Sequence, residues 1–349
     1  MIPQLVEHLR CPATGSPLKL QVIRESSKNY NGITEKIIEK GILWSEQGWF
    51  YPVINGIPRL TIESILEHDS FYTNHIPGFL ALKKKLVSEN FNLINSCVVR
   101  NKRTKESFAL EWSLFNYESD KTWDADRTAM VNRFLKETDE TILSIKNKII
   151  FDVGCGNGLL DQLIAKDTNC VIAMDLSRSI ERAYEKNQER NVLFIQGDVY
   201  FPPIPPRYFD IVHSSGVIHH TPDTFHAFSC LDKTVKNEGK VSIWLYHPRK
   251  NIFHRGSLVL RRISSKWPVK MQFLFYKFTL FPIIFIIKKI KGTSQNSREM
   301  MVDIMDSFSP EYRHEHTHEE AIDLLRRSRY KNIKITTTGI FGFNIIGNK

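Results

Sequence analysis

The sequence predicts an α/β fold built on a mostly parallel, doubly wound sheet. Apolar runs at residues 149–151, 171–174 and 192–195 are typical of short buried strands. Each run is followed closely by an acidic residue: Asp152, Asp175 and Asp198, respectively. After the first run comes a loop with glycine at every second position, and an amphipathic pattern then begins at Leu159. A strand, a tight turn and a helix N-terminus in this order form the ligand-binding corner of such a sheet.

The glycine loop indicates which class of ligand binds at this corner. Gly154, Gly156 and Gly158 form a G-x-G-x-G pattern, in which glycine lets the backbone pass close to a ligand. Asp152 stands just before the loop, where it repels phosphate and favours an ammonium group. The sequence has neither the G-x-G-x-x-G spacing of dinucleotide sites nor the Gly-Lys-Ser/Thr of a P-loop here. We therefore expect a ligand with a cationic, amino-acid-like end and no pyrophosphate.

The later strand ends add candidate binding groups. The carboxylate of Asp175 is placed to hold two ribose hydroxyls, and that of Asp198 can accept from an adenine amino group. A fourth apolar run, 209–214, leads into a segment with two adjacent histidines, His219 and His220.

These strand ends together resemble class I S-adenosylmethionine-dependent methyltransferases, most of all the methyltransferase type 11 group. The motifs are D-V-G-C-G-N-G from Asp152, the acid after the second strand, G-D-V at 197–199 and G-V-I-H-H-T-P-D at 216–223. The resemblance covers about residues 126–349. It implies a Rossmann-like, seven-stranded, mostly parallel sheet with an antiparallel last strand, and S-adenosylmethionine as the cofactor. An unrelated nucleotide-binding sheet is the alternative.

The resemblance also implies cofactor contacts at each strand end. The residues that would line the cofactor, from its methionine end to its adenine, are Asp152, Gly154, Cys155, Gly156, Asn157, Gly158, Asp175, Leu176, Asp198 and Val199. Ser214 or Ser215 would lie beside the methyl group. Cys155 is expected to be a loop residue and not a nucleophile, because no basic residue adjoins it.

A hydroxyl acceptor would also need a base, and histidine suits this role at neutral pH. His219 and His220 follow the fourth strand, where the acceptor would lie, so one of them is the candidate catalytic base. Alternatively, they cap the next helix or hydrogen-bond the loop. His213 lies within an apolar run and is expected to pack. Tyr312, His314 and His316 are further candidates around the acceptor.

The N-terminal residues 1–62 are expected to form a small β-rich segment. They resemble the zinc-ribbon-like domain that precedes or activates some methyltransferases, but only Cys11 remains of its four cysteines. Thr14, Trp44 and Gln47 stand at the other three positions. Because a tetrahedral zinc site needs four ligands, no metal is expected. The segment would then pack against the catalytic domain or a partner.

Residues 63–145 are expected to be a helical bridge, with helical periodicity at 71–86 and 129–145. Between these lies an aromatic segment that would fold over the cofactor. Its lid candidates are Trp112, Phe115 and Tyr117, which could instead be ordinary core aromatics. The catalytic domain would be 146–349, closed by a hairpin of strands at 333–336 and 343–346.

An insertion at about 247–305 is the most individual part of the chain. From His247 to Lys291 it is rich in Lys and Arg and contains no Asp or Glu. Its apolar run, 271–287, is interrupted by Lys277 and Pro282 and is too short to span a bilayer. We expect two helices that form a cap over the acceptor site, with an apolar inner face. Contact with an anionic membrane surface or a lipid-linked acceptor, or with nucleic acid, stays open.

The function expected from these observations is methyl transfer from S-adenosylmethionine to a small or lipid-linked acceptor, with a sugar hydroxyl in glycan or secondary metabolism preferred. A tRNA or a quinone precursor is the alternative within the class, and a non-catalytic cofactor-binding protein is the alternative outside it. Five scattered cysteines and the absence of a signal-peptide pattern favour a cytoplasmic protein, which could lie at the membrane periphery. The net charge of +10 favours an anionic partner only in general terms.

Overall fold

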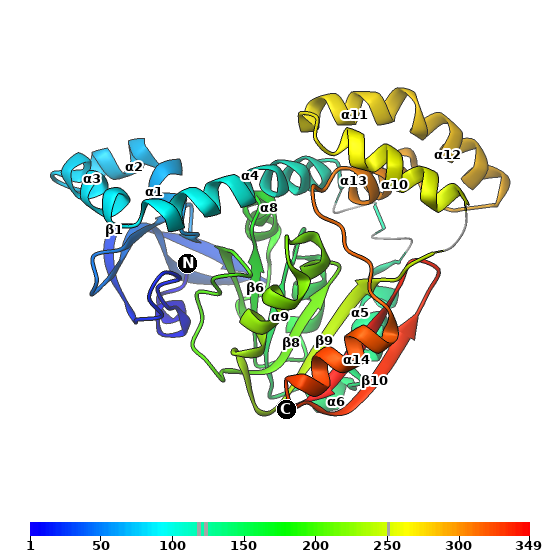
Figure 1. Ribbon diagram of the computed structural model, residues 1–349. Helices are drawn as coiled ribbons and strands as arrows, with labels where there is room; N and C mark the ends of the chain where they lie inside the picture. The colour runs from blue at the N-terminus through cyan, green and yellow to red at the C-terminus, as the bar shows by residue number, and fades with distance from the viewer. Residues whose placement is uncertain (117–119, 122–124, 250–251) are drawn as a thin grey trace.

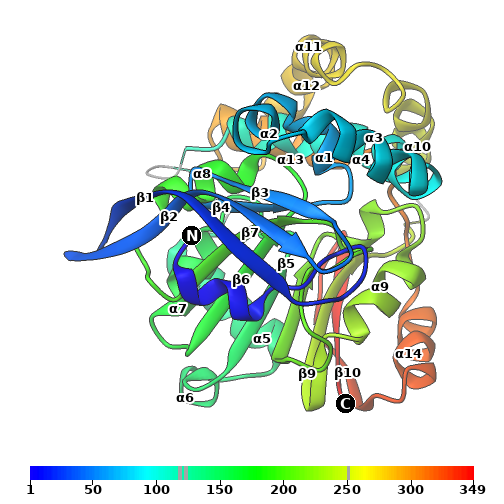
Figure 2. The same cartoon turned by 90° about the vertical axis from the view of Figure 1, so that its left-hand side faces the viewer.

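One sheet of eleven strands runs through the molecule, in the order β1-β2-β3-β4-β7-β6-β5-β8-β9-β11-β10 (Figures 1 and 2). The computed structural model describes residues 1–116, 120–121, 125–249 and 252–349. Tyr117, one of the lid candidates, lies outside these residues.

Seven of the strands form the doubly wound part of the sheet. The parallel members are β5 (Ile149–Val153), β6 (Cys170–Asp175), β7 (Val192–Gly197), β8 (Phe209–Ser215) and β9 (Val235–Tyr246). The hairpin of β10 (Lys331–Thr338) and β11 (Gly342–Asn348) joins β9 through an antiparallel pairing. The strand order changes direction between β5 and β8. A crevice at the carboxyl ends of these two strands is therefore the place where a ligand binds in such a sheet.

The other four strands come from the N-terminal segment, so the expected count of seven is wrong for the sheet as a whole. These strands are β1 (Leu18–Tyr30), β2 (Ile33–Ser45), β3 (Phe50–Ile54) and β4 (Ile57–Leu60). The short strand β4 pairs in parallel with β7, with Leu60 opposite Gly197. Without β4, strand β7 would leave its backbone groups unpaired at the sheet edge. The N-terminal strands therefore continue the main sheet and do not form a sheet of their own.

The positions that resemble zinc ligands make hydrogen bonds with other side chains. Cys11 Sγ is hydrogen-bonded to Tyr51 Oη at 3.3 Å, and Thr14 Oγ1 donates to Gln47 Oε1 at 3.1 Å. The indole of Trp44 donates to Gln21. Within the described residues, no group of three or more His, Cys, Asp or Glu side chains is placed to hold a metal. The likeness to a zinc ribbon thus stays a prediction from sequence.

The bridge consists of several helices, including one long helix. They are α1 (Ser64–Glu67), α2 (Asp69–His75), α3 (Phe79–Glu89), α4 (Phe91–Ser113), α5 (Arg127–Thr138) and α6 (Ile142–Ile145). The expected helix at 71–86 is broken at Pro77-Gly78, where Gly78 has a φ of 69°. The expected helix at 129–145 is broken after Thr138, because Asp139 adopts a φ of 53°. The aromatic segment at 107–113 is the end of α4, which crosses above the sheet (Figure 1).

Helices cover both faces of the sheet, so the parallel strands are apolar on both sides. Helices α5, α7 (Leu159–Ala165) and α8 (Ser179–Lys186) pack on one face, where Ile150 of β5 is buried. On the other face lie α9 (Thr224–Asp232) and α14 (His318–Arg327), with the short turns η1 (Pro3–His8) and η2 (Ile218–His220). Phe151 and Val153 point to this second core, which is continuous with the core of the N-terminal segment.

The apolar run at 271–287 forms two helices as expected, α11 (Val269–Phe278) and α12 (Leu280–Ile290). In the basic insertion, α10 (Ile252–Ser264) precedes them, and α13 (Ser297–Phe308) follows. Helix α13 begins with a capping box between Asn296 and Glu299. A small core that includes Tyr276 and Met305 holds α11 and α12 on α13 and on the end of α4. Figure 1 shows these helices as a lobe beside the carboxyl edge of the sheet. None of the helices described is long and apolar enough to cross a membrane.

Because the two cores are continuous, the N-terminal segment should unfold together with the rest of the sheet. Phe50 is fully buried and packs against Tyr72 and Phe79, so Phe50→Ala should lower the free energy of unfolding by about 3–5 kcal/mol. Urea unfolding followed by tryptophan fluorescence and by circular dichroism should show one transition, moved to lower urea. Ile33→Ala, at an exposed turn, is the control. A separate early transition in Phe50→Ala would show instead that the segment unfolds independently.

Candidate active site

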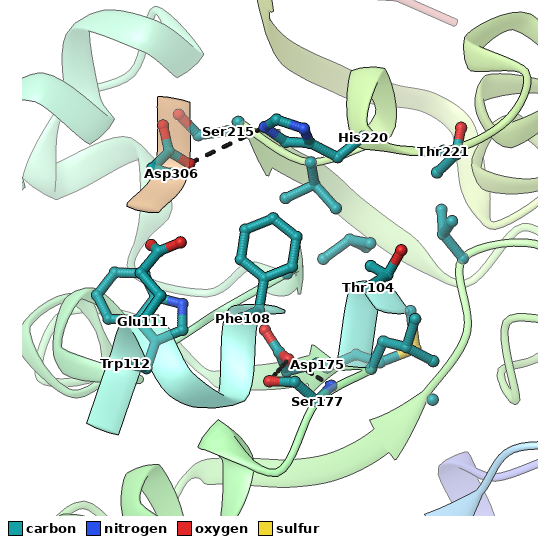
Figure 3. A pocket seen from close by; sticks show the side chains of 18 residues that line it. Thr104, Phe108, Glu111, Trp112, Asp175, Ser177, Ser215, His220, Thr221 and Asp306 are labelled. Carbon is teal, nitrogen blue, oxygen red and sulfur yellow. Dashed lines mark hydrogen bonds and ion pairs between the residues drawn. The ribbon is translucent and has the colours of Figure 1, made fainter. Parts of the chain in front are cut away.

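A cavity of about 730 Å³, including its open mouth, lies at the carboxyl ends of β5, β6, β7 and β8 (Figure 3). We call it the first chamber. Its floor includes Asp175, Leu176 and Val199 from the ends of β6 and β7. Helix α4 supplies four wall residues, namely Thr104, Phe108, Glu111 and Trp112. Asp306 of α13 and His220 of η2 close the opposite wall.

A second chamber of about 590 Å³ lies beside the first, behind the glycine loop. It is lined by Asp152, Cys155, Asn157, Arg133 and Glu137, among others. Trp112, Gly154 and Ser215 line both chambers, so the two meet at the ends of β5 and β8.

The glycine loop is shaped by steric limits on both sides. Gly154 has a φ of 81°, and a Cβ atom there would lie 2.2 Å from Val217. Gly156 has a φ of 56°, and its Cβ would lie 2.6 Å from the ring of Trp112. Both positions therefore need glycine for conformation and for space. Gly156 and Gly158 shape the loop but line neither chamber among the residues described.

A buried charged cluster lies at the second chamber. His213 Nδ1 donates to Asp152 at 2.6 Å, and Nε2 donates to Glu137 at 3.2 Å. Burial lowers the pKa of His213, but the two carboxylates outweigh this effect and raise the pKa to about 10. His213 is therefore protonated and ion-paired, and does more than pack. Burial and the Asp152 carboxylate raise the pKa of the nearby Asp161 well above its ordinary value, so Asp161 stays neutral.

This cluster carries one net negative charge, because one imidazolium balances only one of two carboxylates. That charge favours the ammonium group expected from the sequence, and Arg133 on the same wall can face a carboxylate. Burial raises the pKa of Cys155 well above that of a free thiol, so this residue is not an activated nucleophile. Asn157 accepts from the backbone of Leu159 at 3.0 Å and so fixes the start of α7.

Asp175 lies where the sequence predicts a ribose-binding carboxylate. It accepts from the Ser177 backbone and hydroxyl, both at 2.7 Å, and from the Gly156 backbone at 3.0 Å. These bonds orient the carboxylate toward the first chamber, in which Figure 3 shows it with Ser177. A carboxylate has about four acceptor positions, so capacity for a ligand hydroxyl remains.

Two residues that were predicted to contact the cofactor, Asp198 and Ser214, line neither chamber. Asp198 is buried outside both chambers, where it forms an ion pair with Arg100 and accepts from Asn101 at 2.8 Å. It therefore holds α4 on the sheet, and its carboxylate is not presented to an adenine. Ser214 is also buried, and its hydroxyl is directed to the Val153 carbonyl at 3.5 Å. Ser215, the other candidate, lines both chambers.

Two acid groups that line the first chamber come from helices far apart in the sequence. The carboxylates of Glu111 and Asp306 point toward one another across the cavity (Figure 3). Glu111 is fully buried, and neither of its oxygens has a hydrogen-bond partner within the described residues. Burial, together with Asp306, raises the pKa of Glu111 well above its ordinary value. Burial also raises the pKa of Asp306 to about 6, although Tyr246 donates to it at 2.7 Å.

Of the two candidate bases, only His220 reaches the cavity in the part of the chain described. Its Nδ1 donates to the Tyr312 carbonyl at 2.8 Å, which leaves the lone pair on Nε2. That nitrogen lies 3.9 Å from Asp306 Oδ1. Burial lowers the pKa of His220 to about 3, so its ring is neutral at neutral pH. His219 is fully buried against Trp244 and Tyr246, away from both chambers.

The other acceptor and lid candidates mainly support the wall. His314 and His316 bond to Thr221 and Thr224, both at 3.0 Å, and so hold the 310–316 segment against the loop after β8. Trp112 lines both chambers, whereas Phe115 packs beneath it with Leu159. Sequence analysis missed Glu111 and Asp306, because neither belongs to a motif. The only signal was a single acid within the aromatic stretch of α4.

Part of the chain is similar to a known protein family. Residues 151–243 match the methyltransferase domain family. The matched stretch runs from β5 into β9 and so includes the glycine loop and the strand ends that form the floor of the cavity. This methyltransferase domain match supports methyl transfer as the reaction class.

Two curated relatives are similar to parts of the chain. An uncharacterized methyltransferase of Mycobacterium bovis is 26% identical over 136 residues, which are 37% of this chain and 69% of that protein. A ubiquinone biosynthesis O-methyltransferase of Coxiella burnetii is 28% identical over 105 residues, 29% of this chain and 45% of that protein. Among solved structures, the magnesium protoporphyrin IX methyltransferase of Synechocystis with bound S-adenosylmethionine is 11% identical, with a TM-score of 0.43 over 71% of this chain and 96% of that one.

The His213 cluster makes the stability of the protein depend on pH. Because the pKa rises from 6.5 to about 10 on folding, its stabilisation is complete below pH 6.5 and is lost as the pH rises toward 10. The shift corresponds to at most about 5 kcal/mol. Urea unfolding at pH 7 and pH 9.5 should show a fall in stability for the native protein, and a much smaller fall for His213→Asn. His226→Gln, on the exposed side of α9, should keep the native pH dependence. An unchanged slope in His213→Asn would contradict the ion-paired imidazolium.

Proposed function

We propose that this protein transfers a methyl group from S-adenosylmethionine to a hydroxyl of a small or lipid-linked acceptor. The observation that carries the proposal is the pair of joined chambers at the ends of β5 and β8, with an anionic cluster at one end and Asp175 at the other. Their chemistry fits the cofactor. Asp152 with the His213 pair suits its ammonium group, Arg133 its carboxylate, and Asp175 its ribose hydroxyls.

S-adenosylmethionine, when bound, supplies a methyl group activated on a sulfonium, so the reaction needs no covalent enzyme intermediate. The protein then has to align the acceptor with this group and keep water out. Phe108 and Trp112 of α4 provide apolar walls for this purpose. Cys155 takes no part in the chemistry, since its thiol is neutral.

His220 is the base in this proposal, and Asp306 supports it. The Nδ1 bond to Tyr312 directs the Nε2 lone pair toward Asp306 and the cavity, where it accepts the hydroxyl proton of the acceptor. The imidazolium formed in this way would be unstable in a buried site on its own. The Asp306 carboxylate at 3.9 Å compensates that charge. Protonated Glu111 can donate a hydrogen bond to a second polar group of the acceptor.

The hydrogen-bonding groups of the first chamber indicate which class of molecule receives the methyl group. A sugar suits the part of the first chamber lined by Glu111, Asp306 and His220, which we call the acceptor wall, because neighbouring hydroxyls can bind all three. A quinone precursor is the second candidate, supported by the similarity to the ubiquinone biosynthesis O-methyltransferase of Coxiella and by the apolar rings of Phe108 and Trp112 in the first chamber. A non-catalytic cofactor-binding protein would have no need for a base such as His220.

Cofactor binding is tested by isothermal titration with S-adenosylmethionine. Asp175→Ala should weaken binding at least about tenfold, because hydrogen bonds to a buried carboxylate are lost. Asp323→Ala, on the exposed side of α14, should bind as the native protein does. Thermal unfolding of both variants shows whether the fold is kept. No binding by the native protein would exclude the proposed function.

Catalysis is tested by incubating cell extract with methyl-labelled cofactor and following the label by mass spectrometry. His220→Ala should lower incorporation by about 10²- to 10⁴-fold while cofactor affinity is kept, because the base is removed and Asp175 is not. In the native protein, incorporation should fall as the pH drops below about 6, where Asp306 becomes protonated. In Asp306→Asn, incorporation of the methyl label should no longer fall as the pH drops below about 6. Full activity of His220→Ala would assign the base elsewhere.

A further inference from the structure

The outer surface of α10, α11 and α12 is apolar and basic at the same time. We define this surface, the outer cap face, by the exposed residues of the three helices. Their inner residues, such as Tyr276, pack into the small core on α13 and α4. The outer cap face has no covering element among the described parts of the chain, and Figures 1 and 2 both show α11 and α12 at the edge of the molecule.

Helix α12 has the largest exposed apolar stripe of the three helices, separate from the side that packs on the small core. Its exposed apolar side chains are Ile283, Ile286, Ile287 and Ile290, with exposed fractions of 58%, 58%, 47% and 80%. The spacing i, i+3, i+4, i+7 places all four on one stripe of the helix. The opposite side, with Phe281 and Ile284, packs against the small core. Four isoleucines on a solvent-facing stripe are far more than an isolated exposed apolar residue, which needs no explanation.

Helix α11 repeats this arrangement and adds charge. Met271, Leu274 and Phe278 are exposed, and Lys270 and Lys277 stand on the same side of the helix. On α10, Val259 and Ile263 are exposed beside Arg255 and Arg262. Each helix therefore contributes an apolar stripe, and two of them flank it with cations.

The charges of the outer cap face are all of one sign. No Asp or Glu occurs from His247 to Lys291. Within the described structure, Arg255, Arg262, Lys270 and Lys277 form no ion pair with a carboxylate, whereas Lys288, on the inner side, pairs with Asp303 at 2.6 Å. Their charges are therefore available to an anionic partner.

We propose that the outer cap face docks on the surface of an anionic lipid bilayer. Helices with an apolar side and flanking Lys and Arg lie in the membrane interface, with the apolar side in the acyl boundary and the cations at anionic headgroups. Each basic residue near such a surface contributes about 1 kcal/mol. Because α10–α12 are too short and too charged to cross a bilayer, they lie on it.

Two other partners, a second copy of this chain and a nucleic acid, fit the outer cap face less well than a lipid bilayer. A second copy of this chain, paired through the same face, would bring two sets of unpaired cations together without any acid. Nucleic acid would use the cations but would leave the isoleucine stripe of α12 in water.

If the proposed methyl transfer is correct, docking would also bring the cavity close to a lipid-linked acceptor. Helix α13 carries Asp306 into the first chamber and supports α11 and α12 on its other side. None of the lining residues identified comes from α10, α11 or α12, so these helices form no lid. They hold the mouth of the cavity near the lipid surface, where a lipid-linked acceptor can reach it.

Flotation of the full-length protein with vesicles tests the docking. Binding to vesicles of phosphatidylcholine mixed with phosphatidylglycerol should be strong, and should weaken with salt and with pure phosphatidylcholine. Lys270→Glu/Lys277→Glu should weaken it by about thirtyfold or more, from two lost cations. Phe278→Ser/Ile286→Ser should weaken it at least about tenfold through lost apolar contact. All four side chains are exposed, so the fold is kept.

The matched control is Leu143→Ser/Lys146→Glu on α6, which carries the same kinds of exposed residue at the opposite end of the molecule (Figure 1). This variant should bind as the native protein does. Docking is refuted if the two cap variants bind vesicles as tightly as the native protein. It is also refuted if light scattering shows a dimer that the cap variants dissociate, or if the protein binds tRNA but not the anionic vesicles. Titration with S-adenosylmethionine is independent of lipid, so failure of docking and failure of the methyltransferase proposal are distinguishable.

Discussion

The buried ion pair between Arg100 and Asp198 fixes α4 across the carboxyl edge of the sheet, and most of the site depends on that placement. Asn101 adds a second bond to the same carboxylate and another to Glu63, which in turn pairs with Lys105 at 2.6 Å. Thus one short stretch of α4 links the sheet to the bridge. Breaking such a pair is costly because the remaining charge stays buried. The wall from Thr104 to Trp112 therefore has a fixed position above the strand ends.

The same helix connects the parts that the sequence treats separately. Its far end packs with α11 and α13, and Ser107 is hydrogen-bonded to Ser309 at 2.8 Å. The cavity is thus bounded by a conventional sheet below and by elements outside the matched methyltransferase domain above. This division explains why the floor has the features of a cofactor site whereas the acceptor wall has features of its own.

Sequence patterns located the strand ends and the glycine loop, because their signals are local. An apolar strand, a glycine loop and an acid lie within a few residues of each other, so Asp152, Gly154 and Asp175 could be assigned from spacing alone. The ion-pair partner of Asp198 could not be predicted from local spacing, because Arg100 lies 98 positions earlier in the chain. Glu111 and Asp306 meet only because α4 and α13 pack together. The pairing of β4 with β7 likewise depends on a strand of four residues, too short for a periodicity signal.

In the apolar helices of the cap, the sequence could not predict which side of a helix is buried. From Leu280 to Ile287 helix α12 is apolar all round, so this part of its sequence does not distinguish an inner from an outer side. Packing on α13 decides this, and it leaves Ile283, Ile286, Ile287 and Ile290 exposed. For the acceptor wall, burial likewise sets charge states that no motif encodes: Glu111 neutral, His220 neutral and Asp306 close to its titration point. This wall thus has one proton donor, one lone pair and one carboxyl group near its titration point, the combination that the proposed transfer to a hydroxyl requires.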